Sequence, residues 1–241
     1  PANLLKDIKP AGRNQMPVSS PDVVKLYYGL IEKLAVQHSS KRRVSLTEFV
    51  RPLFKLAEKR SASGDPINEN RAAILALVLY FGDDRFEQFI GDVRTAQQKS
   101  KRQRISHIRL NDRHDFVQHF AISAGLSLTG GDKPANTIGV IKEVKDAASK
   151  KSGFSFTDIG ADRLGVRFAK KATENRKKAL EFQQVLSTAS SERRFFPTFT
   201  DLPQGMTTAQ FQSRYRNVKS KKYKDEIAKI DHRIDAIGMY R

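Results

Sequence analysis

A histidine and several carboxylates lie among apolar residues in the second half of the chain, at spacings that suit chemistry. Three successive segments each carry a pair of such residues, three or four positions apart: Asp115 and His119, Glu143 and Asp146, Asp158 and Asp162. Residues at this spacing lie on one face of a helix. The sequence therefore predicts three helices that direct one imidazole and up to five carboxylates into a shared cavity.

Two kinds of chemistry suit such a cluster, and the sequence leaves both open. Carboxylates and an imidazole can hold a divalent cation that activates water or polarises a scissile bond. The candidate metal ligands are His119, Glu143, Asp146 and Asp162. Without metal, a buried Glu with a raised pKa acts as general acid beside an ionised Asp. The candidate catalytic residues are Glu143, which follows the apolar run IGVI, with His119 and Asp158.

Neighbouring residues are predicted to support this cluster. Carboxylates that lie close together must be neutralised, and Lys142 and Arg163 are the cations in place to do so. Asp115 pairs with His119, and Gly165 lets two helices approach closely.

The alternative interpretation of the same residues is structural. Asp158 lies three residues after Ser155, which is the spacing of a capping box. Asp115 suits a helix N-terminus, and a lone histidine on an apolar face is often a hydrogen-bonded core residue. In that case the polar side chains hold the helices together and the protein is not a catalyst.

The order of these residues resembles a known pattern. Asp115-x-x-x-His119-Phe120, Lys142-Glu143-x-x-Asp146 and Asp158-x-x-Ala161-Asp162-x-x-Gly165 are similar to motifs of the YfiM lipoproteins and the VanZ-like proteins, over about residues 112–168. Phe116 replaces the usual Lys, and Asp162 stands where Asn is common. The resemblance implies a bacterial envelope protein with a polar site among its helices, and it implies no particular activity.

Composition predicts the class of protein and its compartment. A chain of 241 residues that is 39% hydrophobic, with 15 Phe, can bury a sizeable core. The absence of cysteine excludes disulfides, thiolate metal sites and a cysteine nucleophile, and it suits an oxidising compartment. Together with a start that lacks Met, this predicts a periplasmic or secreted protein after signal removal, with a cloned cytoplasmic protein as the alternative. The longest apolar run, residues 72–81, falls short of the ~18 residues of a membrane span.

The charge of the chain predicts anionic partners. Lys and Arg total 44 against 26 acidic residues, a formal net charge of +18 that attracts nucleic acid, lipid headgroups or wall polymers. Two basic runs, KSKRQR and KSKKYK, supply the candidate polyanion-binding residues: Lys99, Lys101, Arg102, Arg104, Lys219, Lys221, Lys222 and Lys224. Solvated helix faces are the alternative interpretation of both runs.

The expected fold is an all-α, multi-helix globular bundle, because alternating β-branched runs are nearly absent. Residues 1–19 form an extended arm, 20–190 a helical core domain whose polar-site helices span 112–170, and 191–241 a loop followed by a basic helical region. Two long helices are expected within the core, one over residues 83–104 and one from about 156 running unbroken to about 189.

These features predict a bacterial envelope-associated helical protein with a His/Glu/Asp site. The first hypothesis is a hydrolase of an anionic or cell-wall polymer, using a Glu acid on glycans such as peptidoglycan or a divalent metal on phosphoesters. The alternative is a non-catalytic basic scaffold that binds wall polymer, lipid headgroups or nucleic acid.

Overall fold

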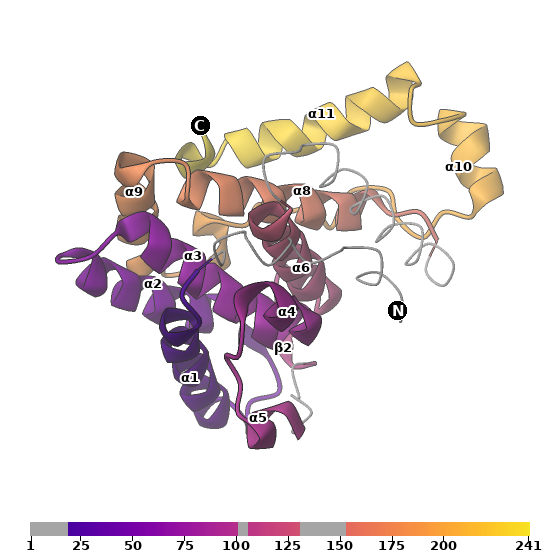
Figure 1. Cartoon of the computed structure of the whole chain (residues 1–241). Coiled ribbons are helices and arrows are strands. Elements are labelled where there is room, and N and C mark those ends of the chain that lie inside the picture. The colour runs from indigo at the N-terminus through magenta and orange to yellow at the C-terminus, as the bar shows by residue number, and fades with distance from the viewer. Residues whose placement is uncertain (1–18, 101–105, 131–152) are drawn as a thin grey trace.

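The fold was obtained as a computed structural model, which describes residues 19–100, 106–130 and 153–241 (Figure 1). It confirms the all-α prediction: among the described residues the only strands are β1 (Val44–Ser45) and β2 (Ile108–Arg109), which are short and parallel, with two isolated bridges elsewhere. Within the described ranges, no helix has the length and hydropathy needed to cross a membrane. Several predicted site residues lie outside these ranges: Lys101, Arg102, Arg104, Lys142, Glu143 and Asp146.

The first half of the chain builds its core around one buried helix. The helices α1 (Pro21–Gln37) and α2 (Thr47–Ser61) pack against α3 (Pro66–Leu77), which continues into a π-helical turn, Val78–Gly82. Residues 72–81 are all buried, which explains why this segment is apolar throughout rather than on one face.

The helix expected over residues 83–104 is wrong. The chain instead forms a 3-10 turn (Asp84–Phe86), the short helix α4 (Glu87–Ile90) and, after a break, α5 (Ala96–Ser100). Gly91 ends α4 with φ of 106°, a conformation that few residues other than glycine adopt. The Glu87 carboxylate then accepts the backbone N–H groups of Val93 and Arg94, which holds the chain outside a helix.

The helices α6 (Asp115–Thr129) and α8 (Phe156–Ala172) pack closely against each other (Figure 1). A methyl group added at Gly165 would collide with the backbone carbonyl of Phe120, so the absence of a side chain sets the helix separation. The close approach expected from Gly165 is therefore present, and it places the polar faces of α6 and α8 against each other.

The long helix expected from 156 to about 189 is also wrong, because it breaks after Ala172. The next helix, α9 (Arg176–Ser187), starts from Asn175, whose side chain accepts the Lys178 backbone N–H. The buried Asn70 donates to the carbonyls of Ala172 and Ala179, at 2.8 and 3.0 Å. A distant side chain thus satisfies backbone carbonyls at the break, and the local pattern of apolar residues does not indicate this contact.

The C-terminal part folds back onto the core. A 3-10 turn (Glu192–Arg194) leads into a loop whose three phenylalanines, at 195, 196 and 199, are fully buried. Thr207 and Gln210 form a capping box at the start of α10 (Thr208–Tyr215). The last helix, α11 (Lys221–Asp235), lies along α8 (Figure 1) and ends in a 3-10 turn, Gly238–Tyr240.

Candidate functional site

His119, on α6, is held against a buried carboxylate of α8. Its Nδ1 lies 3.0 Å from Oδ1 of Asp162, a residue with no exposed surface. The Ser123 hydroxyl, one turn further along α6, donates to the same oxygen at 2.9 Å. Asp162 therefore orients the imidazole ring through one hydrogen bond, and Ser123 holds the same carboxylate oxygen in place.

The opposite side of the ring faces a second carboxylate. Nε2 of His119 lies 3.8 Å from Oδ2 of Asp158, and the two side chains are 15% and 14% exposed. Asp158 sits in the first turn of α8, where its backbone N–H is capped by the Ser155 hydroxyl at 3.2 Å. The imidazole thus lies between one fully buried acid and one that solvent can reach.

This arrangement favours a protonated imidazole. Burial lowers the pKa of His119, but the charge and hydrogen bond of Asp162, with the charges of Asp158 and Asp115, outweigh it and raise the pKa to about 9. Burial raises the pKa of Asp158 above its ordinary value, although the charges of His119 and Arg113 act against this. His119 is therefore an imidazolium at neutral pH beside a carboxyl with an increased affinity for protons.

Arg113 connects this pair to the surface. Its guanidinium bonds Asp115, approaches Asp158 at 3.2 Å and Thr157 Oγ1 at 3.0 Å, and also bonds Gln204. Burial raises the pKa of Asp115, but the hydrogen bonds and charge of Arg113 outweigh it, and the pKa falls below its ordinary range. The network therefore runs from the buried Asp162 to Asp115, whose side chain is 46% exposed.

A tight turn holds Arg113 in place. Leu110 and Arg113 exchange both backbone hydrogen bonds, and the two residues between them have φ of 46° and 60°. Asn and Asp tolerate this left-handed conformation better than most residues, and Asn111 and Asp112 occupy it here. The Asn111 side chain also accepts the Phe199 backbone N–H at 3.1 Å. The turn is thus anchored to the loop that carries Gln204.

The structure brings four predicted site residues together: Asp115, His119, Asp158 and Asp162. Arg163 was expected to neutralise these carboxylates, and that expectation is wrong. Its guanidinium is bonded to Asp231 of α11 at 2.8 and 2.6 Å, on another face of α8, and Arg113 serves the carboxylates instead. The capping interpretation of Asp158 holds for its backbone only, because its carboxylate turns toward Arg113 and His119.

Four members of the network were not predicted: Arg113, Ser123, Thr157 and Gln204. Ser123 could have been found, because it lies four residues after His119 and therefore on the same face of α6. Gln204 comes from a loop 47 residues after Thr157, and no local spacing indicates it.

The structure describes only two of the four predicted metal ligands, His119 and Asp162. The other two, Glu143 and Asp146, lie outside the described residues. Among the residues that the structure does describe, no group of three or more His, Asp or Glu side chains could hold a metal ion.

The second basic run forms an exposed surface where α10 meets α11. We call residues 214–224 the basic corner, a segment that contains no acidic residue. Its six cationic side chains are all exposed: Arg214, Arg216, Lys219, Lys221, Lys222 and Lys224. Lys221 pairs with Asp225 at 2.9 Å, and Arg214 stacks on the Tyr215 ring at 5.4 Å. Lys99, from the first run, is paired with Asp92 and Glu87 and offers less free charge.

The basic corner is packed next to the first turn of α8. The Tyr215 and Tyr223 rings contact Phe156, with centroids 5.0 and 5.4 Å apart. Phe156 is the first residue of α8 and lies two residues before Asp158. The corner therefore lies at the N-terminal end of α8, the helix that carries Asp158.

Comparison of the chain with protein-family models, with curated proteins and with solved structures finds no match. The resemblance to the YfiM and VanZ-like proteins stays a prediction, and the function has to be argued from the site.

Proposed function

We propose that the protein is a hydrolase of an anionic polymer, with His119 as general acid and Asp158 as general base. The observation that carries the proposal is the fully buried Asp162, which binds His119 through Nδ1 and leaves Nε2 directed toward Asp158. A buried ion pair is weak support for stability, since apolar residues of similar volume often stabilise a protein as well or better. A chemical role accounts for keeping charged groups at this helix interface.

The proton transfers follow from the positions of the two groups. Asp158 takes a proton from water as the water oxygen attacks the scissile centre. The bond to the leaving oxygen breaks, and that oxygen takes the Nε2 proton of His119. The proton on Asp158 then passes to His119 through a bridging water across the 3.8 Å gap, which restores both groups.

Asp162 and Arg113 act as positioning residues in this scheme. Asp162 keeps the ring oriented and stabilises its positive charge, in the way that a buried carboxylate supports a catalytic histidine. Arg113 holds Asp158 in place and favours its ionised form. Glu143, the predicted acid of the neighbouring segment, remains a candidate for a third catalytic group.

The experiment is an activity screen with the purified chain on three anionic polymers: peptidoglycan, poly(glycerol phosphate) and single-stranded RNA. We expect release of soluble fragments from one of them. Asp158→Asn and His119→Gln should each lower the rate by about 10²- to 10⁴-fold, the usual contribution of general acid–base catalysis. His232→Gln, which changes an exposed histidine on α11, is the matched control and should leave the rate unchanged.

The pH dependence of the rate gives an independent check. We expect a bell-shaped profile, with an acid limb above the ordinary pKa of Asp and an alkaline limb near pH 9, where His119 loses its proton. No turnover on any of the three polymers, or an Asp158→Asn variant as active as the wild type, would contradict the proposal.

The second candidate function is non-catalytic binding of the polymer, and the basic corner favours it. Binding through several lysines should weaken steeply with salt, because each contact releases counterions. The triple variant with Gln at 219, 222 and 224 should bind more weakly than a control with Gln at Lys33, Lys55 and Lys59, three exposed lysines of α1 and α2. Binding that survives Asp158→Asn, with no turnover, would favour this candidate over the hydrolase.

We also propose that the protein works in the bacterial cell envelope, in the periplasm or after secretion. The support is the resemblance of residues 112–168 to envelope families and the absence of cysteine. Fractionation of cells that produce the protein at its native level tests this, and recovery in the cytoplasmic fraction would contradict it.

A further inference from the structure

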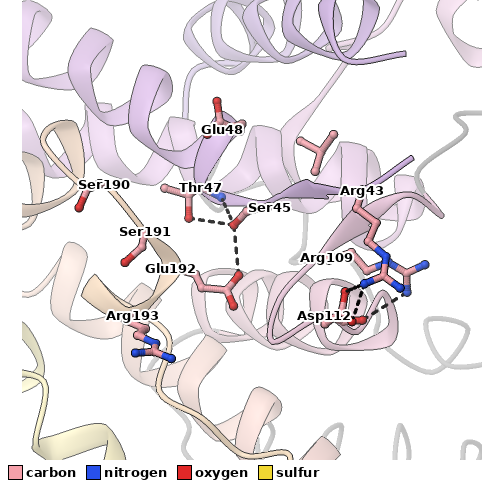
Figure 2. A pocket seen from close by; sticks show the side chains of 11 residues that line it. Arg43, Ser45, Thr47, Glu48, Arg109, Asp112, Ser190, Ser191, Glu192 and Arg193 are labelled. Carbon is pink, nitrogen blue, oxygen red and sulfur yellow. Dashed lines mark hydrogen bonds and ion pairs between the residues drawn. The ribbon is translucent and has the colours of Figure 1, made fainter. Parts of the chain in front are cut away.

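A hollow of about 430 Å³ lies on another part of the molecule, between β1 and the turn that follows α9 (Figure 2). Ser45 and Thr47 form one wall, and Ser190 and Ser191 approach from the other side. The volume is within the range of small-molecule sites. None of the side chains that hold His119 lines it, so it is a separate feature of the fold.

Three acidic side chains line this hollow: Glu48 lies 3.8 Å from Arg51, and the other two are bonded within the fold. Glu192 accepts hydrogen bonds from the Ser45 hydroxyl at 3.1 Å and from the Asn111 backbone N–H at 2.9 Å. Asp112 accepts from Arg43 at 2.9 and 3.0 Å (Figure 2). These carboxylates hold the walls together and have little capacity left for a ligand.

The donor groups, in contrast, are in surplus. Nε of Arg109 is buried and has no hydrogen-bond partner in the part of the chain that the structure describes. Arg193 is exposed at the other end of the hollow and forms no ion pair with a described residue (Figure 2). The hydroxyls of Ser190 and Ser191 likewise donate to no described group. Arg109 and Arg193 both line the hollow, and neither guanidinium forms an ion pair with a described carboxylate, so both supply positive charge for an anionic ligand.

We propose that the hollow binds a sugar-sized ligand that carries an oxyanion, a phosphate or a carboxylate. Arginine side chains suit such groups because the guanidinium presents several donors in one plane. The hydroxyls of Ser45, Thr47, Ser190 and Ser191 between the arginine-bearing ends suit a hydroxylated ring, which both donates and accepts. The proposal does not depend on the hydrolase, because it uses different side chains.

The walls are held in place before any ligand arrives. Glu192 joins β1, through Ser45, to the Asn111 turn, which itself is closed by two backbone hydrogen bonds. A site whose donors are fixed in advance loses less entropy on binding.

The test is isothermal titration of the full chain with glucose 6-phosphate, glucuronate and uncharged glucose. We expect saturable binding of at least one charged sugar and none of glucose up to about 10 mM, the range of weak but specific affinity. The two charged arms distinguish a phosphate from a carboxylate. Arg193→Gln and Arg109→Gln should each weaken binding about tenfold or more, the loss expected for a charge-assisted hydrogen bond.

Arg194→Gln is the matched control, since Arg194 is the exposed neighbour of Arg193 and does not line the hollow. Because Arg193 is exposed, its variant tests the site even if Arg109→Gln fails to fold. The proposal is overturned if neither charged sugar saturates, if glucose binds equally well, or if Arg193→Gln binds as tightly as Arg194→Gln.

Discussion

Two histidines in this molecule have pKa values that are shifted in opposite directions, although burial lowers the pKa of both. His119 lies between Asp158 and Asp162, and its pKa rises to about 9 in spite of burial. Burial lowers the pKa of His107, and the electrostatic interaction with the imidazoles of His38 and His114 lowers it further. The residue type is the same in both sites, so the difference comes from the neighbours. Carboxylate neighbours thus raise the pKa of an imidazole, and imidazole neighbours lower it.

The two sites also differ in the hydrogen-bond partners of their ring nitrogens. Nδ1 of His119 has a carboxylate partner at 3.0 Å. Nδ1 of His38 and Nε2 of His107 are buried and find no partner among the described residues. A proton added at His119 enters an existing set of acceptors, whereas one added at His107 would not. This comparison makes four predictions, which run from the largest expected effect to the smallest.

Asp162→Ala should have the largest effect, because it leaves the imidazolium of His119 without its buried partner. Breaking a buried ion pair from one side costs about 3–5 kcal/mol. Urea unfolding at pH 7 should show this loss. Asp231→Ala breaks the part-exposed pair with Arg163 and is the control, with an expected loss of about 1 kcal/mol or less. If the two variants lost equal free energy of unfolding, the pair of Asp162 with His119 would contribute no more to stability than an exposed ion pair.

The second prediction concerns the alkaline side of the stability profile. The folded pKa of His119 lies above its unfolded value of 6.5, so its stabilising effect is complete below pH 6.5 and is lost as the pH rises through 9. The loss across this window is at most about 3 kcal/mol. Urea unfolding of wild type and His119→Gln from pH 6 to 10 should show curves that converge as the pH rises. Parallel curves would show that the imidazole is not charged in the folded protein.

Part of this comparison could be read from the sequence, and part could not. The pairs Asp115–His119 and Asp158–Asp162 were predictable, because helical geometry fixes which residues share a face once the helix is identified. Arg113 is positioned by a left-handed turn and Gln204 by a distant loop. Neither position produces a periodic pattern in the sequence. The helix break at Gly91 is local, since Glu87 and the glycine itself make it, but the break after Ala172 involves Asn70, from a distant part of the chain. The predicted role of Arg163 is wrong because its partner, Asp231, is 68 residues away in the sequence.

Gly165→Ala should separate the two histidine sites. The added methyl group meets the Phe120 carbonyl, so α6 must move away from α8. Overpacking of this kind costs about 1–3 kcal/mol. In a histidine NMR titration, the pKa of His119 should fall as Asp162 moves away, while that of His107 stays where it is. A variant with both titrations unchanged would show that the contact between the helices does not set the His119–Asp162 distance.

His107 should give the smallest effect, on the acid side of the profile. Its folded pKa lies below the unfolded 6.5, so the unfolded chain binds the proton first as the pH falls, and stability decreases below pH 6.5. His107→Gln should reduce this decrease, because the variant has no imidazole to protonate in the unfolded chain. Urea unfolding between pH 5 and 7 measures it, with His232→Gln as the exposed control. If His107→Gln instead changed the slope above pH 7, the two histidines would share one environment, and the contrast between carboxylate and imidazole neighbours would not explain their behaviour.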